Sequence, residues 1–316
     1  MKPMSTLRKI LIAFAEKTVF ILIISLAFYT SQPIQTTKTL LVPSGSISHI
    51  ITQLSQKGYA LSPIDKYLLV FMGQPQSGWV ELTATKLNRI DFLYQLSTAK
   101  AKMEEITLIP GETLEIFLNQ VAHLLKLDIN LLKNYYTTLS QYPEAGIYAD
   151  TYYIPFGITE KHLIYFLLSR SQEKYKLISE KIYGTYNPKQ WINILTIASI
   201  IQKEAANEKE MPLVASVIYN RLKKEMPLQM DGTLNYGKYS HIKVSAYRIR
   251  NDESRFNTYK YKGLPPSPIG AVSFPAILAA IKPAQTNYLY FMKNKQGVHD
   301  FTDNYATHQK NIQNAR

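Results

Sequence analysis

The stretch Leu195-Thr196-Ile197-Ala198-Ser199-Ile200-Ile201-Gln202-Lys203-Glu204-Ala205 is an almost uninterrupted apolar run that ends in one acid. A run of this length, rich in Leu, Ile and Ala, predicts a mostly buried helix. An apolar wall disfavours the charged form of a carboxyl group and raises its pKa toward the range of a general acid at neutral pH. The run alone also fits a simpler interpretation, in which Gln202, Lys203 and Glu204 form a helix end that faces water.

The length and composition of the chain set the first limits. The 316 residues are more than a single domain with one hydrophobic core usually contains, so we expect two or more domains. The hydrophobic content of 46% is ample for globular packing. Because the chain has no cysteine, disulfide scaffolds, thiolate metal sites and cysteine nucleophiles are excluded.

The chain is strongly basic, with a formal net charge of +13. Its Lys and Arg residues are scattered and form no basic arm or recognition helix, so we do not expect a nucleic-acid partner. A basic domain that faces an anionic polymer outside the cytoplasm fits the same charge, which therefore does not identify the partner.

Positive residues precede an apolar stretch, Thr18–Tyr29, near the start of the chain; they are Lys2, Arg8, Lys9 and Lys17. A charge in mid-bilayer costs roughly 2.5 to 3.5 kcal/mol, so we place the membrane boundary near Lys17. The positive-inside rule then predicts a cytoplasmic segment at 1–17, a transmembrane anchor at 18–33 and an extracytoplasmic remainder. A signal peptide cleaved near Ser25–Ala27 is the alternative, and both interpretations export the body of the chain.

A pattern of strand, Pro/Gly turn and capped helix occurs twice after the anchor. In the first copy Thr39–Val42 is the strand and Ser46 the cap; in the second Ile106–Ile109 is the strand and Thr113 the cap. The repetition suggests a duplicated unit. We expect residues 34–135 to form one small α/β domain.

Residues 136–316 are predicted to form a mixed α+β domain, which makes the whole chain α+β. A second helix from about Glu208 carries Val214, Val217 and Ile218 on one face, so it should pack as a hairpin against the helix that ends at Glu204. Loops rich in proline and glycine follow Asp231, as is typical of an active-site rim.

The motifs that are missing favour carboxylate chemistry. The six histidines are isolated, and no metalloprotease, phosphate-loop, dinucleotide or Gly-x-Ser-x-Gly motif occurs, so we expect no metal and no cofactor. A hydrolytic glycosidase uses two carboxyl groups. In a lytic reaction the C6 hydroxyl of the sugar attacks its own anomeric carbon, and one residue can first donate and then accept the proton.

The chain resembles the endolytic murein transglycosylase family, also called MltG or YceG-like. The order and spacing of the shared motifs agree across about residues 144 to 308. The motifs are Ala198–Glu204, Tyr219–Leu222, Leu228–Asp231, Asn257–Tyr259, Gly263–Pro266 and Tyr288–Phe291.

The resemblance implies that Glu204 is the catalytic acid/base and that the product carries a 1,6-anhydro-MurNAc end. It also implies a bacterial inner-membrane protein with a single helix, a LysM-like domain at 34–135 and a catalytic domain at 136–316 on the periplasmic side. Such an enzyme cleaves nascent peptidoglycan strands between MurNAc and GlcNAc, terminates their elongation and accompanies peptidoglycan synthases.

Four further residues match family motifs and have the chemistry to hold sugar hydroxyls and N-acetyl groups. They are Gln229, Asp231, Asn257 and Tyr259. Asn220 and Arg221 could equally brace the helix hairpin. We expect structural roles for His299 and His308.

Two positions depart from the family pattern: Gln202 stands where Glu is common, and Gly232 follows Asp231 where Pro is usual. The first leaves Glu204 as the essential acid, and the second should loosen the loop. Two alternatives for the function stay open: a non-catalytic peptidoglycan-binding scaffold, and a muramidase with Asp231 as its second carboxylate.

Overall fold

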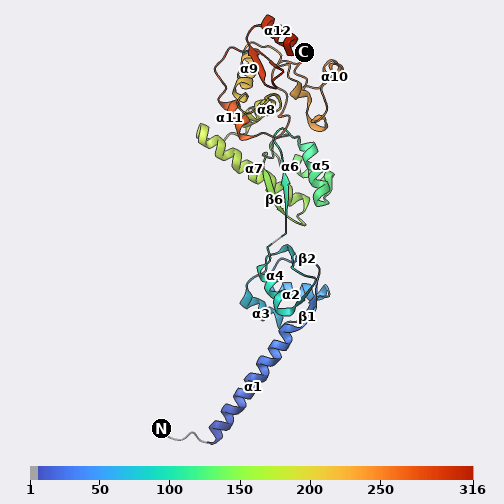
Figure 1. Cartoon of the computed structure of the whole chain (residues 1–316), viewed down its shortest axis with the longest axis vertical. Helices are drawn as coiled ribbons and strands as arrows, with labels where there is room; N and C mark the ends of the chain where they lie inside the picture. Colours follow the sequence, from blue (N-terminus) through green and yellow to red (C-terminus); the bar gives the residue numbers. More distant parts are fainter. Residues whose placement is uncertain (1–5, 101, 316) are drawn as a thin grey trace. The chain divides into compact units, whose positions relative to one another are not determined.

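The computed structural model describes residues 6–100 and 102–315, which form a mixed α+β protein (Figure 1). The described chain divides into two compact units. Unit 1 holds the residues up to Glu104 together with Pro155–Gly157, and unit 2 holds Glu105–Ile154 and the chain from Ile158 onward. Of the predicted cytoplasmic segment 1–17, residues 1–5 lie outside the described part.

Unit 1 begins with helix α1 (Thr6–Ser31). Within the described residues, α1 alone contains a segment, Arg8–Ser31, that is long and apolar enough to cross a membrane, and none of that segment is buried in protein. The other elements of unit 1 are β1 (Pro33–Gln35), β2 (Thr39–Val42), α2 (Ile47–Gln56), α3 (Asp65–Met72), β3 (Gly78–Glu81), β4 (Lys86–Asn88) and α4 (Arg89–Thr98). Antiparallel pairs β1–β4 and β2–β3 and the three short helices enclose one apolar core.

A buried ion pair joins the end of α1 to this core. Arg89 Nη1 lies 2.6 Å from Asp65 Oδ2, and the Tyr29 hydroxyl donates to Asp65 Oδ1 at 2.9 Å. The Arg89 guanidinium also stacks over the Tyr29 ring, 4.2 Å from its centroid. These contacts fix the last turn of α1 against α3 and α4, because a buried charge without its partner would be costly.

The strands of the rest of the chain pair as β5–β6 and β7–β8. Unit 2 contains the remaining elements, apart from Met103 and Glu104 of β5 and Pro155 of β6, which belong to unit 1. The remaining elements are β5 (Met103–Thr107), α5 (Leu114–Leu125), α6 (Ile129–Leu139), β6 (Thr151–Pro155), α7 (Glu160–Tyr183), α8 (Pro188–Glu204), α9 (Met211–Lys223), the 3₁₀ turns η1 (Asp231–Leu234) and η2 (Gly237–Tyr239), α10 (Ala246–Asn251), α11 (Phe274–Ile281), β7 (Tyr290–Lys293), β8 (His299–Thr302) and α12 (Tyr305–Ala315).

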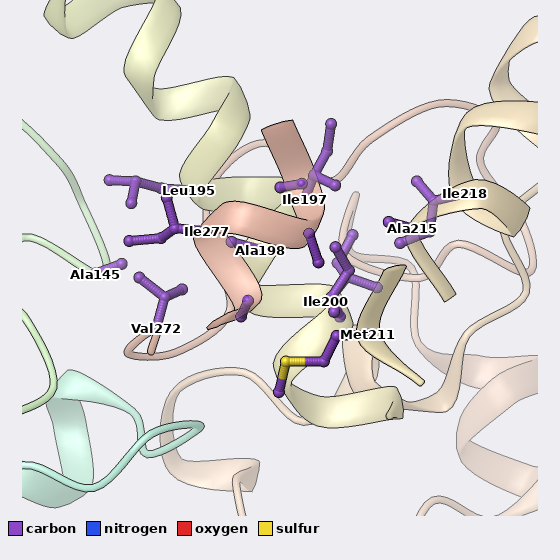
Figure 2. Packing of buried hydrophobic residues seen from close by; sticks show 14 of the residues in the cluster. Ala145, Leu195, Ile197, Ala198, Ile200, Met211, Ala215, Ile218, Val272 and Ile277 are labelled. Carbon is purple, nitrogen blue, oxygen red and sulfur yellow. The ribbon is translucent and has the colours of Figure 1, made fainter. Parts of the chain in front are cut away.

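Helix α8 is the centre of unit 2. Asn187 caps its start by accepting the Lys189 N–H at 3.0 Å, and Pro188 opens the first turn, where its missing N–H costs nothing. Every residue from Leu195 to Ile201 is buried. Figure 2 shows side chains of α8 packed with Ile277 of α11 and Ile218 of α9, so the predicted buried helix and its hairpin with α9 are confirmed.

The two predicted strand–turn–helix copies have different surroundings. Ser46 caps α2 as predicted, since its Oγ accepts the His49 N–H at 3.3 Å. Thr113 occupies the cap position of α5, but its hydroxyl donates to the Gly237 carbonyl at 2.8 Å, and the Leu114 N–H is bound by Glu144 Oε1 at 2.9 Å.

The second copy therefore belongs to a different core from the first. Phe117 of α5 and Leu132 of α6 share a buried cluster with Leu163 of α7, all in unit 2. From the sequence we predicted that residues 34–135 form one domain, whereas in the structure the first segment of unit 1 ends at Glu104. The assignment of these residues to a LysM-like domain stays a prediction.

Candidate active site

Glu204, the last residue of α8, lies in the wall of a cavity of about 480 Å³, here called the Glu204 cavity. Gln229, Asp231 and Tyr259 line the same cavity. The structure thus brings together four of the five side chains that the sequence singled out, from three separate parts of the chain.

The end of α8 is not a water-facing end. Gln202 Oε1 accepts hydrogen bonds from Ser273, Lys203 Nζ lies 3.2 Å from Ser240 Oγ, and Glu204 Oε1 accepts the Gly232 N–H at 2.6 Å. The interpretation of a helix end that faces water is therefore wrong, because each of the three polar side chains is held by another segment of unit 2.

The environment of Glu204 favours a protonated carboxyl. Burial and, to a smaller extent, the neighbouring charge of Asp231 raise the pKa of Glu204 to about 7, against the opposing effects of the Gly232 N–H, Arg221 and Lys203. A carboxyl group with a pKa near neutrality can both donate and accept a proton at working pH.

Gly232 lies so close to Glu204 that a side chain there would force its neighbours to move. A Cβ at Gly232 would lie 2.8 Å from Glu204 Oε1 and 2.9 Å from Lys203 Cβ. The amide of Gly232 lies at the start of η1, where no carbonyl of the turn can accept it, so it is free to bind the carboxylate. A proline would have no N–H to donate.

The loop before Gly232 is tied to a second loop. Gln229 N donates to the Thr258 carbonyl at 3.1 Å, and Met230 N donates to Thr258 Oγ1 at 3.2 Å. Gln229 has φ +49°, a left-handed conformation that costs a non-glycine residue roughly 1 kcal/mol or more and needs such support. These bonds hold the loop that leads to Gly232.

Asp231 and Tyr259 form a hydrogen-bonded pair in the cavity wall. The Tyr259 hydroxyl donates to Asp231 Oδ1 at 2.7 Å. Burial, together with the Asp231 carboxylate, raises the pKa of Tyr259 above its usual value, so the phenol stays protonated and remains a donor. The pair presents oxygen atoms suited to sugar hydroxyls.

Asn257, the fifth predicted site residue, does not line the cavity. Its side chain is fully buried, and its Nδ2 donates to the carbonyls of Ile249 and Asp252, each at 2.8 Å. Its Oδ1 accepts the Tyr259 N–H at 3.1 Å. Asn257 therefore shapes the loop that carries Tyr259, because both ends of its amide are already bonded to the backbone.

Gln202 has a packing role. Its Oε1 accepts the Ser273 hydroxyl at 2.6 Å and the Ser273 N–H at 3.2 Å, at the residue that caps α11. The position thus joins α8 to α11, and Gln202 does not line the Glu204 cavity.

Arg221 of α9 and residues of the chain's last elements also line the cavity, and the sequence did not assign them to the site. Arg221 donates to the Leu228 and Leu289 carbonyls, both at 2.6 Å, so it braces the fold as well as lining the cavity. His299 and His308, predicted as structural, line it too. In the sequence, the alternation of His299 and Phe301 is consistent with a strand that directs both side chains to one face. It does not indicate which residues His299 contacts.

Within residues 6–100 and 102–315, no cluster of three or more His, Asp and Glu side chains that could hold a metal ion is found.

Comparison with known proteins gives a consistent set of relatives. The sequence profile of the YceG-like family matches residues 40–314. A Bacillus subtilis protein named endolytic murein transglycosylase is 41% identical over 117 residues, which cover 37% of this chain and 32% of that protein. A Streptococcus pneumoniae protein of the same name is 30% identical over 177 residues, which cover 54% and 31%. The matches span about a third of the length of these relatives.

A solved structure agrees with the fold. The 2.6 Å crystal structure of a YceG-like protein from Listeria monocytogenes is similar with a TM-score of 0.57 and 25% sequence identity, and the match covers 86% of this chain and 97% of that one.

Proposed function

Because the chain belongs to the YceG-like family, we propose that it is a lytic transglycosylase that cleaves the glycan strands of peptidoglycan. The observation that carries the proposal is Glu204, whose pKa is raised to about 7 and which lies in a cavity lined by hydrogen-bonding side chains. The names of two relatives, endolytic murein transglycosylase, support the substrate class.

In the proposed reaction Glu204 donates its proton to the glycosidic oxygen between MurNAc and GlcNAc. The C6 hydroxyl of the MurNAc attacks its own anomeric carbon, the bond to the leaving oxygen breaks, and the hydroxyl proton passes to the Glu204 carboxylate. The product is a 1,6-anhydro-MurNAc end, and no water is consumed. The Gly232 N–H stabilises the carboxylate formed in the first step.

Substrate contacts are assigned by position. Gln229, Asp231 and Tyr259 line the cavity and would hold sugar hydroxyls and N-acetyl groups. Asn257, predicted to touch substrate, is assigned to support of the Tyr259 loop instead, because its amide is fully bonded.

Helix α1 is proposed as a single membrane anchor at 18–33, with residues 1–17 in the cytoplasm of a bacterium and the rest outside the inner membrane. Of the proposed LysM-like region at 34–135, residues 34–104 lie in unit 1, and residues 105–135 lie in unit 2 together with most of the proposed catalytic domain at 136–316. The anchor would hold the enzyme where nascent strands emerge from peptidoglycan synthases, so internal cleavage there would end elongation.

The test is mass spectrometry of the products that the full chain in detergent releases from uncrosslinked glycan strands. We expect fragments lighter than the hydrolysis product by one water, and none from Glu204→Gln. Glu208→Gln is the matched control, because that acid is exposed and four residues beyond Glu204.

Other outcomes would contradict the proposal. Anhydro-ended products from Glu204→Gln would exclude Glu204 as the acid. Full-mass reducing ends would indicate a muramidase with Asp231 as second carboxylate. Intact strands, with sacculus binding unchanged by Glu204→Gln, would indicate a scaffold.

A further inference from the structure

A histidine held by a carboxylate lies in the same cavity as Glu204. His299 Nδ1 is 2.7 Å from Glu210 Oε2, and the His299 backbone N–H donates to Glu210 Oε1 at 2.9 Å. The side chains are 9% and 10% exposed. Two bonds between one pair of residues fix both the place and the rotation of the imidazole.

Glu210 also connects this pair to the end of α8. Its Oε2 accepts the N–H of Ala206, two residues after Glu204, at 3.3 Å. Strand β8, which carries His299, is thereby tied to the segment that leaves the proposed acid. The same carboxylate therefore sets the position of His299 relative to Glu204.

The bond to Glu210 fixes the tautomer of His299. Burial would raise the pKa of Glu210, but the hydrogen bonds from His299 outweigh that effect and lower it, so the carboxylate is ionised and acts as an acceptor. In the neutral imidazole Nδ1 must then carry the hydrogen, which leaves the lone pair on Nε2. Among the residues that the structure describes, none forms a hydrogen bond with Nε2, and His299 lines the cavity.

Other polar groups in the cavity are less suited to accept a proton. Asp231 already accepts from the Tyr259 hydroxyl. His308 stacks on the Tyr290 ring at 5.1 Å, and within the described chain its buried Nδ1 has no hydrogen-bond partner. Arg221 and Lys293 are cationic donors. Among the described residues that line the cavity, His299 is the histidine whose ring is oriented by a hydrogen bond and whose other nitrogen forms none.

We propose that His299 is the base that removes the proton from the attacking C6 hydroxyl, with Glu210 as its positioning residue. The inference rests on the proposed function and refines its mechanism: Glu204 keeps the acid step, and His299 takes over the base step. The C6 O–H proton goes to Nε2, the bond from O6 to C1 forms, the C1–O4 bond breaks, and O4 takes the Glu204 proton. A proton returns from imidazolium to Glu204 through solvent.

The decisive variant is His299→Asn in the full chain in detergent. An asparagine amide can replace Nδ1–H in the bond to Glu210, but it has no atom at the place of Nε2. We expect an unchanged unfolding temperature, a kcat about 100-fold or more below wild type and little change in KM, in keeping with the usual contribution of a general base. His162→Asn is the control, since His162 is exposed on α7 and bonded to Thr159.

A second measurement separates chemistry from structure. In His299→Ala, added imidazole should restore activity at least 10-fold, because it can supply the missing base. Near wild-type kcat in His299→Asn, or no rescue of His299→Ala, would overturn the inference. The proposed function stands or falls separately, on whether wild type releases anhydro-ended fragments and Glu204→Gln does not.

Discussion

Two regions of unit 2 each contain a carboxyl group whose pKa burial raises to about 7, Glu204 at the end of α8 and Glu144 beside the start of α5. Both accept backbone N–H groups. Glu144 Oε1 binds the N–H of Leu114 at 2.9 Å and that of Ala145 at 3.3 Å, so it serves as a helix cap. Glu204 lines the cavity of about 480 Å³, and Glu144 does not. A raised pKa therefore does not by itself mark a catalytic acid; access to a substrate-sized space does.

Lys203 lies between the two regions. Burial lowers the pKa of its amine, while the charges of Glu112, Glu144 and Glu204 oppose that shift. Its Nζ bonds Ser240 on the Glu112 side. In the last turn of α8, Glu204 thus faces the cavity and Lys203 faces the side of the α5 cap, because neighbouring residues of a helix lie on different faces.

The largest difference between the regions should be in catalysis. We expect Glu204→Gln to lower the rate of glycan cleavage by about 1,000-fold or more, because the acid is lost. Glu144→Gln should stay within a few-fold of wild type, since a glutamine oxygen can still accept the Leu114 N–H. Rates are measured as soluble fragments released per enzyme and unit time. Equal losses of rate in both variants would contradict the different roles given to Glu204 and Glu144.

A glycine in each region gives a sharper test of position. Gly232→Ala puts a Cβ 2.8 Å from Glu204 Oε1 and should lower kcat roughly 10- to 100-fold by displacing the carboxyl group. Gly270→Ala puts a Cβ 2.8 Å from the Gly111 carbonyl, near the α5 cap, and should cost about 1–3 kcal/mol of stability while the folded fraction keeps its activity.

Kinetics and thermal unfolding of the two glycine variants check this together. We expect opposite results for the two variants: Gly232→Ala loses activity, and Gly270→Ala loses stability. If Gly232→Ala kept full kcat, the close contact with Glu204 would have no catalytic meaning.

The sequence predicted the features that depend on local pattern. The apolar run to Ile201 gave α8, Ser46 gave a cap, and the motifs placed Gln229, Asp231 and Tyr259 near Glu204. Each of these follows from periodicity, turn chemistry or family spacing.

The features that the sequence missed depend on contacts between distant segments. Glu210 and His299 are 89 residues apart, and Glu144 and Leu114 are 30 apart. The burial of Asn257 follows from the path of its own loop, in which two carbonyls converge on the amide. No spacing rule brings such groups together, because tertiary packing decides where their polar atoms find partners.

The smallest expected effect concerns stability against pH, and here the two carboxyl groups should behave alike. The pKa of each is about 7 in the folded chain against an ordinary 4.5, so the folded state holds protons that the unfolded state has released. Stability is then fullest below about pH 4.5 and is lost as pH rises through 7. At about 1.4 kcal/mol per pKa unit, reduced for partial exposure to solvent, each group should contribute roughly 1–2 kcal/mol of that loss.

Replacing either group by glutamine should therefore flatten the stability profile between pH 5 and pH 8, although only Glu204→Gln should also abolish cleavage. Trp191 is buried in the core around α8 and reports on unit 2, and a Trp79→Phe background removes the other tryptophan. Thermal unfolding followed by its fluorescence, with the exposed Glu208→Gln as control, measures the slope. A slope unchanged in Glu144→Gln would mean that Glu144 is ionised throughout this range. The two regions would then share only a carboxyl group that accepts backbone N–H groups. The raised pKa would in that case distinguish Glu204 from Glu144.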